Sequence, residues 1–410
     1  MEKKEFVVIG IDDNAELTFA NEILKIILGA TVFSGGKRHY LLVKKFLPQG
    51  AEWIDITVPL ETVFEKYDNV KSNTIVVFAS GDPLFFGFAV TLQKRLPFAN
   101  VKVYPIFNSL QMLAHKLVMR YDDMRIISLT GRPWLEFDRA LIERANKIGI
   151  LTDGNHTPAI IAARATEYGF TNYKMVIGEC LGGKEERINK HCLHEVVDKT
   201  AISPNCVIME RIGSNTDLER KFGISDELFM PLNGRINMIT KKPVRLLLLS
   251  MLNLYNCDSF WDIGFCTGAV SIEAKMQFPH LRVASFEIRK EGRELMEVNS
   301  KRLGTPGIDV FIGDFTILNL DDIIGKDSEN GNILPPDAVF IGGHGGKLVE
   351  IINKIYPVIK EGGRIVFNSV SQQSNNLFIQ GITGAGMKLL STVSITIDSY
   401  NTIVVMTAQK

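Results

Sequence analysis

The sequence predicts an α/β protein with two domains in tandem, and three observations carry this prediction. The chain has 410 residues, which is long for one compact core. Apolar, strand-like runs alternate with amphipathic, helix-like runs, a pattern typical of mainly parallel sheets. A polar, glycine-punctuated segment at residues 211–233 interrupts the alternation, which begins again after it.

In the first half, short apolar runs are expected to form strands that end in turn-forming residues. A strand at 6–10 is followed by a helix at 15–30 and a strand at 31–36. Further strands are expected at 73–82, 101–106, 125–131, 147–154 and 174–182. Their ends carry candidate binding loops, because open α/β sheets bind ligands at the carboxyl ends of their strands.

The second half is expected to repeat the alternation up to the end of the chain. Helices are expected at 241–254, 269–278, 290–303 and 347–359. Strands are expected at 259–264, 282–288, 309–314, 338–343 and 363–370. Residues 387–409 supply two more strands, which we expect to pair antiparallel at one edge of the sheet.

Composition argues against several classes of function. Lysine and arginine together number 46, as do aspartate and glutamate, so no basic excess favours binding to nucleic acid. The apolar run at 244–255 is far shorter than the roughly 20 residues that span a bilayer, and the start shows no export signal. We therefore expect a cytoplasmic protein without a nucleic-acid or membrane partner.

The cysteines indicate free thiols rather than a disulfide framework or a metal site. They are Cys180, Cys192, Cys206, Cys257 and Cys266. Their number is odd and no two form a C-x-x-C pair, which suits a reducing compartment. His191, Cys192 and His194 form a local cluster without a second cluster at a suitable spacing. No metal is expected there, and an exposed loop or strand edge is the preferred interpretation.

The stretch WDIGFCTG at residues 261–268 joins an expected strand to an expected helix. A glycine loop in this position lets backbone approach a ligand and presents the helix amino end to it. A dinucleotide-binding loop requires the spacing G-x-G-x-x-G. Here Gly264 and Gly268 flank Cys266 and follow Asp262, which departs from that spacing. A tight turn without any ligand is the structural alternative.

Two acids at later strand ends add a nucleoside signature to this loop. Glu287 ends the next strand, where a carboxylate can accept both ribose hydroxyls, and Asp314 ends the third strand, where it could meet an adenine amino group. Loop and acids together resemble the Rossmann-like S-adenosylmethionine methyltransferases. That resemblance implies a cofactor site made of Asp262, Gly264, Cys266, Gly268, Glu287 and Asp314. A nicotinamide-dependent reductase is the rival enzyme interpretation.

Cys266 is compatible with the methyltransferase interpretation. S-adenosylmethionine carries no pyrophosphate, so a small side chain can replace a glycine in a loop that cradles no phosphate. If residue 266 needs a positive φ, the substitution costs on the order of 1 kcal/mol. We therefore expect the loop to bind its cofactor despite the cysteine.

A second glycine motif, IGGHGG at residues 341–346, follows the fourth strand, where folds of this kind hold the substrate. Gly342, Gly343 and Gly345 would let a broad ligand lie against backbone, and an ordinary flexible loop is the alternative. Three cations at the start of the expected helix at 241–254 would suit a polycarboxylate substrate, although a solvated helix start explains them as well. These cations are Lys241, Lys242 and Arg245.

The first half carries a different signature in ASGDPLFFG at residues 79–87, a strand that ends in a restricted turn. This stretch resembles the cofactor loop of the tetrapyrrole methylases, a second and unrelated fold that methylates from S-adenosylmethionine. Further segments that match the family stand in the same order, at 32–40, 108–117, 127–133, 151–169 and 177–188. The resemblance implies that Gly81 and Asp82 lie against the cofactor and that the loop at 151–159 completes the pocket.

The two halves together imply two unrelated α/β methyltransferase folds in tandem. The first half resembles the corrin-ring branch that methylates carbon 5, and the second resembles the partner that methylates carbon 15 and removes the ring C acetate carboxylate. The implied domains are 1–210 and 234–410, with a linker at 211–233. The resemblance further implies cobalamin biosynthesis, a tetrapyrrole substrate, one S-adenosylmethionine per domain and a homo-oligomer.

The sequence departs from the patterns of these families in three features. Asp12, Asp13 and Asn14 stand in a loop that is usually rich in glycine and proline. Cys266 replaces the middle glycine of its loop, and His344 stands where a small hydroxyl residue is expected. A histidine there would bind a ring carboxylate or fill space.

The expected chemistry requires few catalytic residues. Methyl transfer from a sulfonium to an electron-rich carbon depends on positioning and on water exclusion more than on acid–base catalysis. The conjugated macrocycle takes up the electron pair released when carbon dioxide leaves. His344 or Asn368 is expected to steer the proton that replaces the carboxylate. In a further alternative, one half binds S-adenosylmethionine as a scaffold without turnover.

Overall fold

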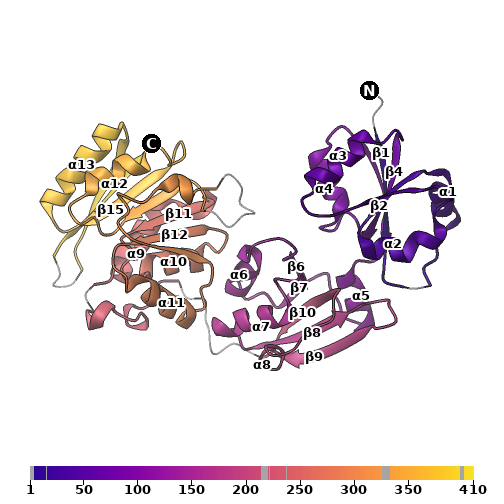
Figure 1. Ribbon diagram of the computed structural model, residues 1–410. Helices are drawn as coiled ribbons and strands as arrows, with labels where there is room; N and C mark the ends of the chain where they lie inside the picture. The colour runs from indigo at the N-terminus through magenta and orange to yellow at the C-terminus, as the bar shows by residue number, and fades with distance from the viewer. Residues whose placement is uncertain are drawn as a thin grey trace. The chain divides into compact units, whose positions relative to one another are not determined.

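A computed structural model describes residues 4–14, 16–213, 220, 222–236, 238–325, 333–397 and 401–410. The chain forms two compact units (Figure 1). The first unit comprises Met1–Thr130, Lys147–Ile160 and Lys174–Glu210, and the second comprises Gly131–Asn146, Ile161–Tyr173 and Arg211–Lys410. Part of the predicted linker, residues 214–219 and 221, lies outside the described residues.

The first unit begins with a five-stranded sheet in which all neighbouring strands run parallel. Its order is β3-β2-β4-β1-β5. The strands are β1 (Glu5–Ile11), β2 (Val32–Gly35), β3 (Glu52–Asp55), β4 (Thr74–Ser80) and β5 (Asn100–Tyr104), and the helices are α1 (Asn21–Gly29), α2 (Lys37–Val43), α3 (Glu61–Asn69) and α4 (Phe88–Arg95). Phe6 and Val8 join one apolar cluster, while Val7 and Ile9 join another. Because both faces are buried, β1 reads as a continuous apolar run.

A second sheet in the first unit is mixed, although the sequence predicted mainly parallel strands. Its order is β6-β7-β10-β8-β9, with β6 parallel to β7 but β10 antiparallel to β7 and β9 antiparallel to β8. A short turn joins β8 to β9, which permits only antiparallel pairing. The strands are β6 (Arg125–Ser128), β7 (Lys147–Leu151), β8 (Tyr173–Glu179), β9 (Arg187–Cys192) and β10 (Asn205–Arg211), and the helices of this stretch are α5 (Ser109–Lys116), α6 (Leu135–Ile142), α7 (Pro158–Glu167) and α8 (Leu193–Val196).

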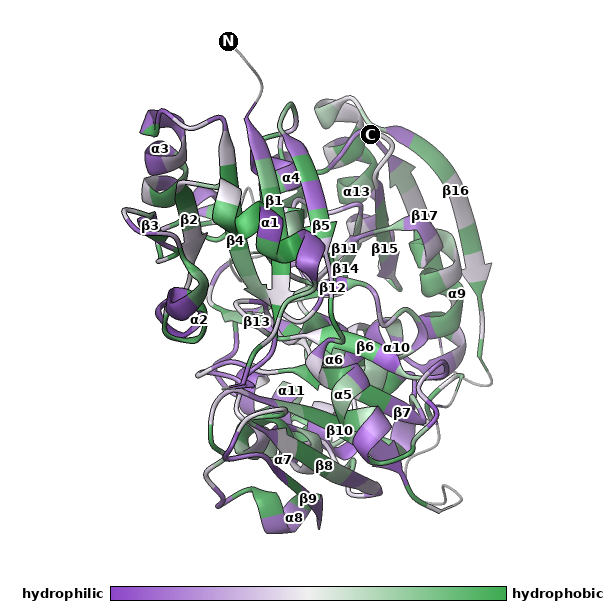
Figure 2. Cartoon of the chain, turned by 90° about the vertical axis from the view of Figure 1, so that its right-hand side faces the viewer, coloured by the Kyte–Doolittle hydropathy of each residue, from purple (hydrophilic) through white to green (hydrophobic). Residues whose placement is uncertain are grey.

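The second unit is built on a seven-stranded sheet of order β13-β12-β11-β14-β15-β17-β16. The strands are β11 (Ser259–Ile263), β12 (Arg282–Glu287), β13 (Ile308–Ile312), β14 (Ala338–Ile341), β15 (Arg364–Ser369), β16 (Lys388–Ile395) and β17 (Ile403–Gln409). The first five run parallel, and β17 is antiparallel to both β15 and β16. The predicted antiparallel pair at the sheet edge is therefore confirmed. Figure 2 shows green and pale segments along β16, whose residues are nearly all exposed.

Side chains of alternate strand residues enter two separate apolar clusters on this sheet. Phe260 of β11 packs in a cluster with Leu248, whereas Trp261 packs in another with Ile352. The helices are α9 (Lys242–Leu252), α10 (Ala269–Gln277), α11 (Gly292–Arg302), α12 (Leu348–Ile355) and α13 (Gln372–Ala385). The carboxyl ends of β11, β12 and β14 meet at one edge of the sheet, which brings their loops together. No helix in the described ranges is both long enough and apolar enough to cross a bilayer.

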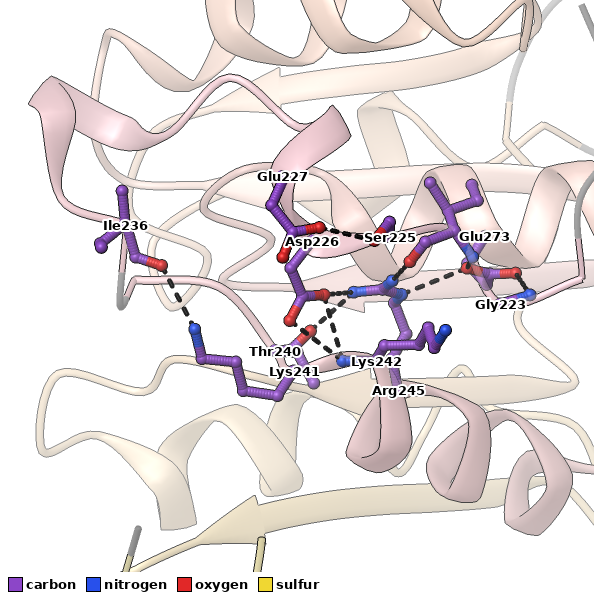
Figure 3. Close-up of polar contacts among 11 residues, drawn as sticks. Gly223, Ser225, Asp226, Glu227, Ile236, Thr240, Lys241, Lys242, Arg245 and Glu273 are labelled. Atoms are coloured by element: carbon purple, nitrogen blue, oxygen red, sulfur yellow. Dashed lines mark hydrogen bonds and ion pairs between the residues drawn. The ribbon is translucent and has the colours of Figure 1, made fainter. Parts of the chain in front are cut away.

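Arg245 on α9 anchors the segment that leads into this sheet (Figure 3). Its fully buried guanidinium lies between two carboxylates, with Nη1 3.0 Å from Asp226 Oδ1 and Nε 3.3 Å from Glu273 Oε2. It also donates to the carbonyl oxygens of Thr240, at 2.8 Å, and Ile224. Glu273, equally buried, accepts the Ile224 backbone N–H at 2.8 Å. The cluster therefore ties the chain before α9 to α10.

This placement corrects the prediction that Arg245 binds substrate. Its Nε, Nη1 and Nη2 atoms all donate to oxygen atoms of the protein and none is exposed, so the side chain does not reach a ligand. Lys242 is exposed, and its backbone N–H donates to Asp226. The side chain of Lys241 lies 3.4 Å from the Ile236 carbonyl oxygen. Arg245 instead fixes Thr240, which lines a cavity described below.

We expect Arg245→Met to destabilise the second unit by about 3–5 kcal/mol, because it leaves the fully buried carboxylate of Glu273 and the partly buried carboxylate of Asp226 without a cation. Lys242→Met is the matched control, since it removes an exposed charge from the same helix. Denaturant unfolding monitored by circular dichroism measures both effects. Equal midpoints for the two variants would contradict the anchoring role.

Candidate functional site

The loop after β11 is a turn in which three residues have left-handed backbone. Gly264, Cys266 and Gly268 have φ values of 76°, 53° and 77°, and α10 begins directly after Gly268. Glycine adopts this conformation freely, whereas a cysteine holds it at a cost on the order of 1 kcal/mol. Residue 266 therefore has the positive φ whose cost was considered above.

The two glycine motifs of the second unit pack backbone against backbone. A Cβ atom on Gly264 would lie 2.5 Å from Gly343 N, and one on Gly342 would lie 3.1 Å from the Gly264 carbonyl oxygen. Strand pairing causes this approach, because Ile263 and Ile341 are partners in adjacent parallel strands. The Gly342 N–H then donates to the Ile263 carbonyl oxygen at 2.8 Å. A side chain at 264 would separate the two loops.

Glu287 supports the loop after β11 from the end of β12. It is 3% exposed, and its Oε2 accepts the Cys266 N–H at 2.9 Å. Its Oε1 accepts the Arg289 N–H at 3.1 Å and lies 3.3 Å from Arg289 Nη1. Carboxylate oxygens each have two lone-pair directions, and Glu287 lines a cavity of about 220 Å³. The carboxylate can therefore accept further hydrogen bonds from a ligand.

Asp314 lines the same cavity and is held in its ionised form. Its Oδ1 accepts the backbone N–H of Thr316 at 2.9 Å and the Thr316 hydroxyl at 2.7 Å. Its Oδ2 accepts from Lys347 Nζ at 2.7 Å. Lys347, with help from Thr316, lowers the pKa of Asp314 to about 2. The structure thus brings Glu287 and Asp314 to one cavity as two hydrogen-bond acceptors.

His344 also lines this smaller cavity, together with Gly345. Its Nδ1 accepts the Gly346 N–H at 3.1 Å, and its Nε2 lies 3.3 Å from Ser374 Oγ. Because Nδ1 accepts an N–H, the ring proton is on Nε2, and burial lowers the pKa of His344. The histidine lines the cavity that Glu287 and Asp314 also line, and not the larger cavity next to it.

A larger cavity, of about 510 Å³, is also lined by the glycine loops. It is lined by Gly342 and Gly343, by Asn368 at the end of β15, and by Lys241 but not Lys242. The Asn368 side chain has no hydrogen bond within the described ranges. His344 and Asn368, predicted for one role, thus line different cavities. Gly264, Arg289 and Gly343 line both cavities, which are therefore adjacent.

Asp262 lies outside both cavities, in contrast to its predicted contact with a cofactor. It is fully buried beneath the loop, where its Oδ2 accepts the Ser271 hydroxyl at 2.5 Å. Ser271 in turn lies 2.8 Å from the Ser285 hydroxyl, while Asp262 Oδ1 has no partner in the described part of the chain. Burial raises the pKa of Asp262 to about 7 despite the Ser271 hydrogen bond.

The loop after β4 in the first unit is also a close backbone approach. Gly81 has a φ of 64°, and a Cβ atom there would lie 2.9 Å from Asn108 Cα. Asp82 uses its Oδ1 to accept the Leu84 N–H at 2.9 Å, which closes an Asx turn. Gly81 lines a cavity of about 400 Å³, whereas Asp82 does not. Of the loop at 151–159, only Leu151 lines this cavity.

Sequence reasoning missed several residues that line these cavities. Arg289 lines both cavities of the second unit, and Arg38, His39 and Ser80 line the cavity of the first. Two of them carry a signal that was readable, because Arg289 and Ser80 lie at the carboxyl ends of parallel strands. Arg38 and His39 start a helix, and no local pattern shows which way their side chains point.

Known proteins match the chain over most of its length or over one part of it. Residues 234–407 match the family model for the precorrin methyltransferase domain. The chain is 28% identical over 367 residues to precorrin-6Y C(5,15)-methyltransferase (decarboxylating) of Sinorhizobium sp, covering 89% of this chain and 84% of that protein. It is 36% identical over 151 residues to cobalt-precorrin-6B C(15)-methyltransferase (decarboxylating) of Salmonella typhimurium, covering 37% and 71%. It is 29% identical over 182 residues to cobalt-precorrin-7 C(5)-methyltransferase of the same organism, covering 44% and 88%.

We expect Asp262→Asn to change the pH dependence of stability. In the folded chain the pKa of Asp262 is about 7, whereas an unfolded aspartate titrates near about 3.9. Between these values the folded state binds more protons than the unfolded state, so this carboxyl makes the parent less stable as the pH rises from about 4 to 7. The variant lacks this loss, so its unfolding midpoint relative to the parent should be higher at pH 8 than at pH 5.

Denaturant unfolding of parent and variant at both pH values provides the measurement. Asp321→Asn is the control, since it removes an exposed carboxylate of the same unit. If the unfolding midpoints of Asp262→Asn and the parent differ by the same amount at pH 5 and at pH 8, the raised pKa assigned to Asp262 is contradicted.

Proposed function

Because the chain belongs to the precorrin methyltransferases, we propose that it methylates a corrin-ring precursor at carbons 5 and 15 and removes the carboxylate of the ring C acetate. One observation carries this proposal. A relative whose name gives both carbons aligns with 89% of the chain. Relatives whose names give a single carbon align with 37% and 44%. The length of the chain therefore fits two methylating domains, which we assign to residues 1–210 and 234–410.

The methyl donor implied by the family is S-adenosylmethionine, and the cavity of about 220 Å³ fits its nucleoside end. Glu287 and Asp314 provide carboxylate acceptors at its wall. Such acceptors are suited to ribose hydroxyls and to an adenine amino group. The close contact of Gly264 with Gly343 leaves no room for a side chain at residue 264, which lines both cavities. When bound, the cofactor would supply an electrophilic methyl group.

A second cofactor site is proposed for the first unit, beside Gly81. Backbone at Gly81 approaches Asn108 so closely that only glycine fits, and the cavity there holds about 400 Å³. Asp82 would act indirectly by closing the turn rather than by touching the ligand. One cofactor per domain is thus supported by two separate cavities, each beside a glycine-dependent loop.

We assign the larger cavity of the second unit to the corrin substrate at carbon 15. Its wall combines glycine backbone, the Asn368 amide and the cations Lys241 and Arg289. The cations would bind ring carboxylates, and the amide would orient the acetate that loses carbon dioxide. The electron pair of the broken bond enters the conjugated ring, and a proton takes the place of the carboxylate. Asn368 lines this larger cavity and is therefore better placed to steer the proton than His344, which lines the smaller cavity.

Calorimetric titration of the whole chain with S-adenosylhomocysteine tests the two sites. We expect two sites in the parent and one in Glu287→Ala, because this change removes the ribose acceptor and the support of the Cys266 N–H. Glu294→Ala removes an exposed carboxylate on α11 and should retain both sites.

Either of two results would overturn part of the proposal. A single site that Glu287→Ala leaves intact would remove the second unit as a cofactor site. Binding of NADPH instead of S-adenosylhomocysteine would revive the reductase interpretation.

A further inference from the structure

The cavity of the first unit has a polar wall formed by Asp13, Arg38, His39 and Ser80, which no step of the chemistry above uses. Ser80 ends β4 directly before Gly81, and Arg38 and His39 lie on α2. All four residues line the cavity. What this wall offers a ligand depends on where its hydrogen atoms are.

The backbone determines the tautomer of His39. The Gly36 N–H donates to His39 Nδ1 at 3.2 Å. An amide N–H is only a donor, so Nδ1 acts as an acceptor and carries no proton. Burial, followed by the nearby charge of Arg38, lowers the pKa of His39 to about 4. The ring is therefore neutral at physiological pH, with its one proton on Nε2.

Ser80 consequently receives two hydrogen bonds. His39 Nε2 lies 2.9 Å from Ser80 Oγ and must donate to it. Arg38 Nη2, which has no acceptor capacity, donates to the same oxygen at 2.7 Å. A hydroxyl oxygen has two lone pairs and one hydrogen, so both lone pairs are occupied. The Ser80 hydrogen has no acceptor in the described part of the chain, and the exposed side chain lines the cavity, where a ligand can accept this hydrogen.

Arg38 is held in place by the carboxylate of Asp13, with which it forms an ion pair. With Arg38 fixed in this way, Ser80 receives two hydrogen bonds, and these polarise its hydroxyl and strengthen it as a donor. A strong donor beside a guanidinium is best matched by an anionic oxygen. Asp12 also lines the cavity and would repel an anion close to it.

We propose that Ser80 is a carboxylate-binding residue of the carbon 5 site, with Arg38 and His39 as the residues that position its hydroxyl. The proposal rests on the proposed function for the identity of the ligand, since both the corrin substrate and the amino-acid end of S-adenosylmethionine carry carboxylates. Ser80 donates its hydrogen to one carboxylate oxygen in this cavity. The orientation is built into the wall before any ligand arrives.

The test compares Ser80→Ala with Ser80→Thr in the full chain. Ser80→Thr keeps the hydroxyl and is the matched control, and carbon 15 methylation by the same chain reports that the protein is folded. A methyl donor labelled with carbon-13 distinguishes the two product methyl groups by NMR. We expect Ser80→Ala to lower kcat/KM for carbon 5 by about 10-fold to 100-fold. Ser80→Thr should stay within about 3-fold of the parent, and carbon 15 methylation should not change.

Two further readings distinguish the source of the carboxylate. If the substrate supplies it, Ser80→Ala raises the KM for the corrin while the affinity of the first unit for S-adenosylhomocysteine stays the same. If the cofactor supplies it, that affinity falls instead. Unchanged KM and unchanged affinity in Ser80→Ala would overturn the proposal.

Failure of the proposed function would look different, because the parent itself would make no carbon 5 product. In that case the titration with S-adenosylhomocysteine by itself tests the role of Ser80. Equal affinities of the parent and Ser80→Ala, or no binding by the first unit, would overturn the proposed role of Ser80.

Discussion

The contact of Gly264 with Gly343 is the constraint on which the candidate site of the second unit depends. It joins two loops that are far apart in the sequence but follow neighbouring parallel strands. Backbone meets backbone there, and both glycines line the two cavities of the second unit. A methyl group that passed between ligands in these cavities would need a short path, and glycines at the shared wall would help to keep it short.

Glu287 extends that constraint to the next strand. Its carboxylate binds the N–H of Cys266, so the same side chain that faces the smaller cavity also holds the turn in its left-handed form. Binding and support are thereby coupled in one residue. The wall of Ser80 in the first unit follows a similar logic, because the hydrogen bonds that hold its hydroxyl also determine what the hydroxyl can offer.

Sequence patterns predicted the parts of this protein that depend on local periodicity. The alternation of strands and helices, the glycine loops and the antiparallel edge pair β16–β17 all follow from short-range signals. Glu287 and Asp314 were predicted because both end parallel strands, and strand ends meet at one edge. The position of an acid along a strand therefore translates directly into a place in the site.

Burial and pairing were the features that the sequence could not supply. Arg245 follows two lysines at a helix start, so its charge suggested a solvated or ligand-binding face. Its partners Asp226 and Glu273 lie in other elements, and only the fold brings them to it. Asp262 was misplaced for a related reason, since a strand residue next to a loop points either to the cavity or to the core. The order of β6 to β10 also depends on turn lengths rather than on apolar pattern.

Cys266 has a further consequence if this site binds a sulfonium cofactor, as proposed above. A thiolate is a strong nucleophile and would itself be a methyl acceptor, whereas the protonated thiol is a poor one. Burial, and then the negative charge of Glu287, raise the pKa of Cys266. The thiol at the wall of the larger cavity thus remains protonated. Burial first, and the carboxylate that holds the loop second, therefore favour the less nucleophilic form of this thiol.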